Sequence, residues 1–86
     1  MNEETANHAR NLLGEGASPT SIFRYLLEKG GPSRQDHFHL VHDLQSLFDM
    51  SVDSLLMIGA WDKWKKNGYD DSTLDEKLKG RIKMKN

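Results

Sequence analysis

The chain has 86 residues and a formal net charge of −1, which fits one small domain with a radius of gyration of roughly 12 Å. It contains no cysteine, which excludes a disulfide scaffold, a thiol nucleophile and thiolate zinc sites. No apolar run approaches the roughly 18 residues of a membrane-spanning helix, and the first residues lack the pattern of a signal peptide. We therefore expect one cytoplasmic domain over residues 1–86 that makes no membrane contact.

Charge is unevenly distributed along the chain. Residues 1–60 carry four basic and eight acidic side chains, whereas residues 61–86 carry eight basic and five acidic ones. The two parts can therefore present faces of opposite sign to a partner. Lysines in the last turns of a helix also complement its dipole, so the basic end can be explained without a ligand.

The distribution of glycines and apolar residues predicts an all-α protein. β-Branched residues are scarce and no stretch alternates apolar and polar positions, which argues against a sheet. Glycines divide the chain into segments with helical periodicity. The pattern predicts a compact bundle of four to five short helices over about 3–13, 19–29, 34–48, 52–66 and 73–83. Helices two to four are expected to make the core, the last helix to close one side, and residues 80–86 to form a frayed tail.

Polar residues at the segment boundaries predict where these helices begin. Serine is a favoured N-cap, and it precedes four of the segments, at Ser18, Ser33, Ser51 and Ser72. Pro19 follows the first of these caps at a position where its missing N–H costs nothing. Asp36 and Asp75 stand three residues after the second and fourth caps, which is the spacing of a capping box.

The predicted helix over 52–66 carries apolar residues on two faces. One face has Val52, Leu55 and Leu56, and the other has Met57, Trp61 and Trp64. Such a helix is either enclosed by its neighbours or leaves one face for a partner. Tryptophan and methionine are common at interface centres, with lysines around them as a polar rim. Partner contact is therefore predicted for Met57, Trp61, Trp64, Lys65 and Tyr69, with Asp70 and Asp71 as an acidic rim. Burial in the core is the competing interpretation of both Trp61 and Trp64.

Residues 37–61 show a recurring local pattern. A first helix patterned Leu40, Val41, Leu44, Phe48 is followed by a two-residue link and by Ser51-Val52 opening a second helix. This resembles the helix-turn-helix pair in the C-terminal domain of the bacterial ribosomal stalk protein, over under a third of the chain. The resemblance is also shared with small bacterial proteins that act as immunity partners of secreted toxins, which implies protein binding.

The resemblance does not imply a ribosomal role. The stalk family has glycine in its link where this chain has Asp49. The family's alanine-lysine pair, whose lysine meets translation factors, falls on Leu55 and Leu56. The stalk domain also has strands beside its helices, and none is expected here, so the fold implied by the resemblance is partial.

Histidines and aspartates gather near the start of the third predicted helix. Only His39, His42 and Asp43 could approach one ion, because side chains three and four residues apart are neighbours on a helix. His37 lies within the apolar arc, where a buried histidine is the simpler interpretation. We therefore expect no bound metal and no cofactor.

The sequence gives little support to catalysis and some to DNA binding. It has no glycine-rich phosphate loop and no distinctive acid pair, so a non-enzymatic protein is predicted; a small ribonuclease using His39 or His42 is the enzymatic alternative. Residues 18–48 have the layout of a helix-turn-helix DNA reader, with Arg34, Gln35 and His39 near its recognition helix. Residues 1–60 are net negative, however, which opposes phosphate binding. The favoured function is an inhibitor, immunity-type or adaptor protein that binds another protein, a toxin among the candidates, or a second copy of itself.

Overall fold

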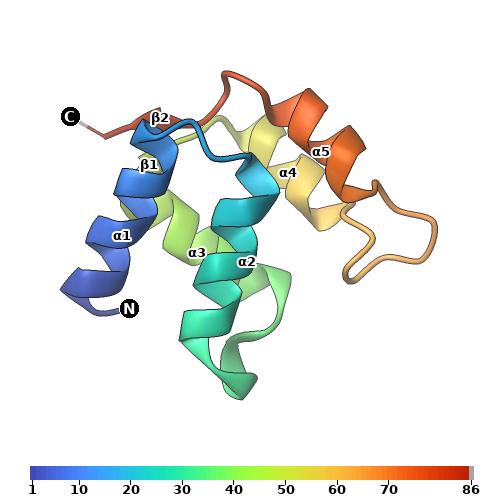
Figure 1. Cartoon of the computed structure of the whole chain (residues 1–86). Helices are drawn as coiled ribbons and strands as arrows, with labels where there is room; N and C mark the ends of the chain where they lie inside the picture. The colour runs from blue at the N-terminus through green and yellow to red at the C-terminus, as the bar shows by residue number, and fades with distance from the viewer. Residues whose placement is uncertain (86) are drawn as a thin grey trace.

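Five α-helices and two very short strands form the described part of the chain, residues 1–85, in a computed structural model (Figure 1). In chain order they are α1 (Glu3–Gly14), α2 (Pro19–Gly30), the 3-10 turn η1 (Pro32–Arg34), α3 (His37–Leu47), β1 (Phe48–Asp49), α4 (Val52–Gly59), α5 (Asp71–Leu78) and β2 (Lys83–Met84). The radius of gyration is 11.9 Å. The predicted helical bundle is confirmed.

Each α-helix begins after a side chain that accepts a hydrogen bond from a backbone N–H of its first turn. These N-caps are Asn2, Ser18, Asp36, Ser51 and Asp70. Ser18 and Ser51 were predicted, whereas Asp36 and Asp70 take the places expected for Ser33 and Ser72. A carboxylate at a helix N-terminus gains from the helix dipole as well as from the hydrogen bond, which favours aspartate over the nearby serines.

The core is one cluster to which all five helices contribute. Its buried hydrophobic residues are Ala9, Ile22, Phe23, Leu26, Leu27, Leu40, Leu44, Leu47, Phe48, Ile58, Trp61, Leu74, Leu78 and Ile82. α4 supplies less of it than predicted, because Ile58 is the only core member within that helix. α5 supplies two leucines, so it is part of the core rather than a cover over one side.

The fourth helix is shorter than predicted, ending at Gly59 instead of continuing to residue 66. Beyond it, the Tyr69 N–H donates to the Ala60 carbonyl (2.7 Å) and the Asp62 N–H donates to the Tyr69 carbonyl (2.8 Å). These bonds close residues 60–69 into a loop, which we call the 60–69 loop. The pairing replaces the helical hydrogen bonds that the predicted longer helix would need.

The last helix is also shorter than predicted, ending at Leu78 instead of residue 83, and a short strand follows it. The predicted fraying of residues 80–86 stays a prediction. α5 stops at Leu78, and Gly80 follows in the left-handed region at φ 74°. Ile82 then returns to the core with 8% of its surface exposed, and β2 pairs antiparallel with β1. This pair corrects the expectation that no strand forms; residue 86 lies outside the described residues.

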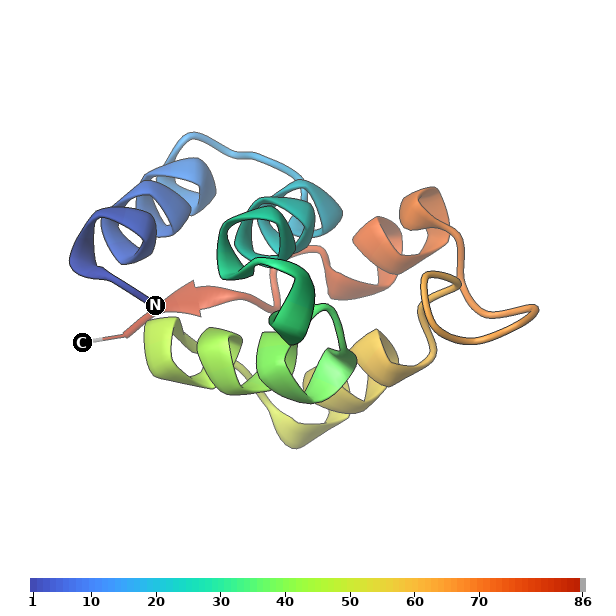
Figure 2. The same cartoon turned by 90° about the horizontal axis from the view of Figure 1, so that it is seen from below.

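Helices α3 and α4 and the 60–69 loop can be located in Figure 2. Figure 2 shows α3 and α4 along one side of the molecule, with the 60–69 loop at the end farthest from the two termini. Within residues 1–85, none of the helices is both long and apolar enough to span a bilayer.

Candidate protein-binding face

Trp61 lies in the core. Its side chain is fully buried, and its indole N–H donates to Asp71 Oδ1 at 2.7 Å. The ring packs edge-to-face against Phe23 and Trp64, with centroid distances of 5.9 and 5.2 Å, and the Arg24 guanidinium lies 5.0 Å from it. The predicted contact between Trp61 and a partner is therefore wrong, and its competing interpretation as a core residue is confirmed.

Asp70 and Asp71 serve the fold rather than forming a free acidic rim. Asp71 accepts hydrogen bonds from Trp61 and, through both oxygens, from Arg24. Burial raises the pKa of Asp71, but these hydrogen bonds and the Arg24 charge together hold it below its ordinary value. Asp70 caps α5, and the hydrogen bond from the Thr73 N–H lowers the pKa of its carboxyl.

Trp64 is half-buried and also has a structural contact. Its indole N–H donates to the Ile58 carbonyl at 2.9 Å, which satisfies an acceptor near the end of α4. Its ring lies 5.7 Å from the His37 ring, between centroids. Lys65, by contrast, is exposed on the 60–69 loop. The predicted set is therefore divided between the interior and the surface.

The outer side of α4 exposes large aliphatic side chains. Val52 and Leu56 are 71% and 69% exposed, and they lie four residues apart, one turn along the helix. Beside Leu56 is an open hollow of about 420 Å³, lined by Asp53, Leu56, Met57, Ala60, Tyr69 and Arg81. We call Val52, Leu56 and this hollow the α4 face. It brings together Met57 and Tyr69, two of the residues predicted to contact a partner.

Sequence reasoning found only Met57 and Tyr69 of this face and missed its other five members, Val52, Asp53, Leu56, Ala60 and Arg81. Leu56 was assigned to the apolar side of the helix opposite Met57, and its i, i+4 relation to Val52 was the pattern that could have identified an exposed row. Arg81 reaches the hollow because the chain turns back after α5 toward β1. No local pattern predicts that return.

Phe38 is a further exposed apolar side chain, at the start of α3. It lies in the first turn of α3 and is 76% exposed. His37 stacks on Phe38 at 4.5 Å and lies against Trp64, and a Cβ added at Gly59 would sit 3.9 Å from the His37 ring. The start of α3 therefore adjoins the end of α4. His37 itself is half-buried, not enclosed as predicted.

Cationic side chains lie at the hollow and on the 60–69 loop that adjoins it. The Lys77 ammonium lies 5.0 Å from the centre of the Tyr69 ring, and Arg81 lines the hollow directly. Three more lysines, Lys63, Lys65 and Lys66, are exposed on the 60–69 loop. None of these five forms an ion pair with another residue in the described chain. The carboxylates nearby, Asp53, Asp62 and Asp70, are fewer, so the surroundings are net positive.

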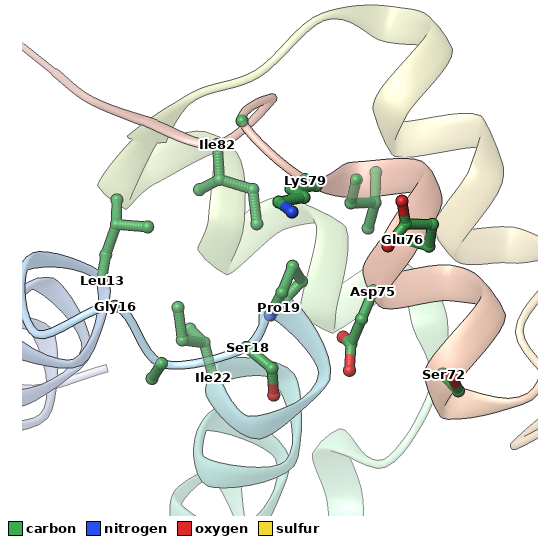
Figure 3. A pocket seen from close by; sticks show the side chains of 13 residues that line it. Leu13, Gly16, Ser18, Pro19, Ile22, Ser72, Asp75, Glu76, Lys79 and Ile82 are labelled. Atoms are coloured by element: carbon green, nitrogen blue, oxygen red, sulfur yellow. The ribbon is translucent and has the colours of Figure 1, made fainter.

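A larger hollow of about 640 Å³ lies between the start of α2, α5 and residues 79–82 (Figure 3). Its apolar lining is Leu13, Ala17, Pro19, Ile22, Leu78 and Ile82. Asp75 points across it in Figure 3, and its two oxygens accept from the Thr20 N–H (2.8 Å) and hydroxyl (3.0 Å). The remaining charges, Glu76 and Lys79, are opposite, so the groove favours neither an anion nor a cation.

The residues considered for metal and DNA binding are engaged elsewhere. No group of three His, Asp or Glu side chains in residues 1–85 is arranged to hold a metal ion. His39 bonds to Asp36 at 2.9 Å, while the buried Asp43 pairs with Arg34 at 2.9 Å, which separates the predicted trio. Gln35 donates its side-chain amide to the carbonyls of Leu27 and Gly31.

Comparisons with known proteins add no relative to this description. No family model matches the chain, and neither a curated protein nor a solved structure matches it significantly. The resemblance of residues 37–61 to the ribosomal stalk domain stays a prediction. The α4 face is therefore the feature that bears on function.

Proposed function

We propose that this protein is a non-enzymatic binding module that docks another protein on the α4 face, acting as an inhibitor, immunity-type partner or adaptor. The observation that carries the proposal is the exposure of Val52 and Leu56 beside an apolar hollow. Burial of one such side chain contributes about 1.5–3 kcal/mol, so water contact is unfavourable for both. A partner that covers them would gain that energy.

Helices α1 and α2 differ from α4 in the residues that they expose. The outward residues of α1 and α2 include Glu3, Glu4, Glu28 and Lys29, whose charges favour contact with water. α4 instead turns two aliphatic residues outward and has its polar Ser54 buried. A small soluble domain has no use for this arrangement in its own folding, because the exposed pair adds nothing to the core.

No exposed group of residues comparable to the α4 face favours DNA binding. Two of the three side chains on which that alternative was based, Arg34 and Gln35, bond to Asp43 and to backbone carbonyls. The third, His39, is half-buried and bonds to Asp36. A base contact would have to break these internal bonds.

The experiment is affinity capture from a lysate of the cells that make the protein, followed by mass spectrometry. Wild type is compared with Leu56→Asp and with Met84→Asp, which changes another exposed apolar residue outside the α4 face. We expect one stoichiometric partner with wild type and Met84→Asp and its loss with Leu56→Asp. Trp64 is unsuitable as the test position, because its indole bonds to the Ile58 carbonyl.

Circular dichroism and light scattering complete the experiment. Far-ultraviolet spectra identical to wild type show that the variants fold. A captured partner that is retained by Leu56→Asp contradicts the proposed face. A wild-type dimer that Leu56→Asp converts to a monomer, with nothing captured, means that the face binds a second copy instead. A monomer that captures nothing contradicts the proposal as a whole.

A further inference from the structure

We propose that the α4 face selects an acidic segment of its partner, which inserts one apolar side chain into the hollow and places carboxylates beside Lys77 and Arg81. This inference rests on the proposed function and adds the chemistry of the partner. It follows from three features of the described residues: the apolar floor of the hollow, its open shape and the sign of the charges around it.

The floor of the hollow is made for an apolar side chain. Four of its six lining residues, Leu56, Met57, Ala60 and Tyr69, are apolar or aromatic, and the hollow of about 420 Å³ is open to solvent. An open, shallow site suits an anchoring side chain that belongs to a larger partner, because a small free ligand would remain in contact with water. Met57 adds adaptability, since its unbranched side chain can adjust to the shape of the anchor.

The cations around the hollow determine which flanking residues the anchor can have. The Lys77 ammonium lies 5.0 Å from the centre of the Tyr69 ring, a cation–aromatic contact that favours its position beside the hollow. Arg81 is exposed and can bind a carboxylate through two parallel hydrogen bonds. Both lie on the α5 side of the hollow, and Asp53 lies on the α4 side.

The neighbouring 60–69 loop strengthens the same preference. It leaves and rejoins the hollow at Ala60 and Tyr69, and it carries Lys63, Lys65 and Lys66 against the single carboxylate of Asp62. Including Lys77, Arg81, Asp53 and the exposed Asp70 next to Tyr69, the charged groups of the hollow and its adjoining loop are five cations and three anions. A partner with acidic residues beside its anchor is attracted to this surface, and a basic one is repelled.

The test is selection from a library of random short peptides. Peptides are selected on wild-type protein and counter-selected on Leu56→Asp. We expect the enriched sequences to share one large apolar residue flanked by aspartate or glutamate. The most enriched peptide is then synthesised, and its affinity is measured by titration calorimetry at several salt concentrations. Its affinity should fall as salt rises, because exposed charges are screened.

Charge reversal distinguishes the rim of the hollow from the overall charge of the protein. The double variant Lys77→Glu, Arg81→Glu should weaken the synthetic peptide by about tenfold or more at low salt. The matched control is Arg10→Glu, Lys29→Glu, which makes the same change of charge elsewhere. Lys29 lies 5.9 Å from the Tyr25 ring, so it loses a comparable cation–aromatic contact. The control should bind the peptide several-fold more tightly than the rim variant.

Several results would overturn the inference. They are an enrichment of neutral or basic peptides, no enrichment that depends on Leu56, or equal effects of the rim and control variants. Binding to phosphatidylserine vesicles that depends on Leu56, without peptide enrichment, would make this a membrane surface instead. If capture yields a partner that requires Leu56 but binds the rim variant normally, the proposed function stands and the acidic partner does not.

Discussion

The two sides of the chain between Val52 and Asp71 differ in how they use large apolar side chains. On the inner side, Trp61 is fully buried and its one polar atom bonds to Asp71. On the outer side, Leu56 is 69% exposed and adds nothing to the core. Both residues belong to the same apolar segment of the sequence. The difference shows that hydrophobicity alone does not separate residues that stabilise this fold from residues available to a partner.

The largest effect is expected from truncating the inner side. Trp61→Ala removes the packing against Phe23 and Trp64 and leaves Asp71 with a lost donor, so it should lower the free energy of unfolding by about 3–5 kcal/mol. Leu56→Ala should change it by less than about 0.5 kcal/mol. Urea unfolding followed by far-ultraviolet circular dichroism measures both. Equal effects at the two positions would contradict the contrast between the sides.

A smaller effect is expected where the 60–69 loop closes. A Cβ at Gly68 would lie 2.3 Å from the Ala60 carbonyl oxygen, which is impossible without moving backbone. Gly68→Ala should therefore cost about 1–3 kcal/mol of unfolding free energy and displace Tyr69 from the hollow. Gly14→Ala is the matched control, since nothing lies within 4 Å of its added Cβ. The same urea titration applies, and a Gly68 variant as stable as the control would show that the loop tolerates opening.

The starts of helices were more predictable than their ends. Ser18 and Ser51 act within one turn of their own chain, so a local pattern was sufficient to find them. The end of α4 depends on the hydrogen bonds between residues 60–62 and Tyr69. The sequence does not indicate this end, because the spacing of Trp61 and Trp64 continues the helical period. The β1–β2 pair joins residues more than thirty positions apart, and no local pattern predicts it.

The candidate site was predicted in part for the same reason. Met57 and Tyr69 were both among the residues predicted to contact a partner, and the structure places them in the lining of one hollow. Arg81 enters through the turn after α5 and could not be found locally. Asp71 was predicted to contact a partner, because the sequence does not show that the side chains of Trp61 and Arg24 form hydrogen bonds with it. The acids preceding Thr73 were nevertheless typical of a helix start, which could have indicated the cap at Asp70.

The smallest effect concerns the carboxylate that holds the inner side together. The pKa of Asp71 is lower in the folded protein, so its ionised form stabilises the fold. That contribution is complete above the unfolded pKa of about 3.9 and is lost as pH falls through the folded value. Asp71→Asn keeps an oxygen for the Trp61 indole but loses the Arg24 ion pair. Because both partners are well exposed, the loss at neutral pH should be about 1 kcal/mol or less.

The pH dependence identifies this contribution, since Asp36 and Asp70 also have lowered pKa values and add to acid sensitivity in every variant. Urea unfolding of wild type, Asp71→Asn and the exposed control Asp62→Asn is compared near neutral pH and at about pH 3. The stability difference between wild type and Asp71→Asn should shrink at the lower pH, whereas Asp62→Asn should follow wild type at both. A difference that stays constant with pH would mean that Asp71 acts through its hydrogen-bond geometry alone, and the charge of Arg24 would then have no part in holding Trp61 on the inner side.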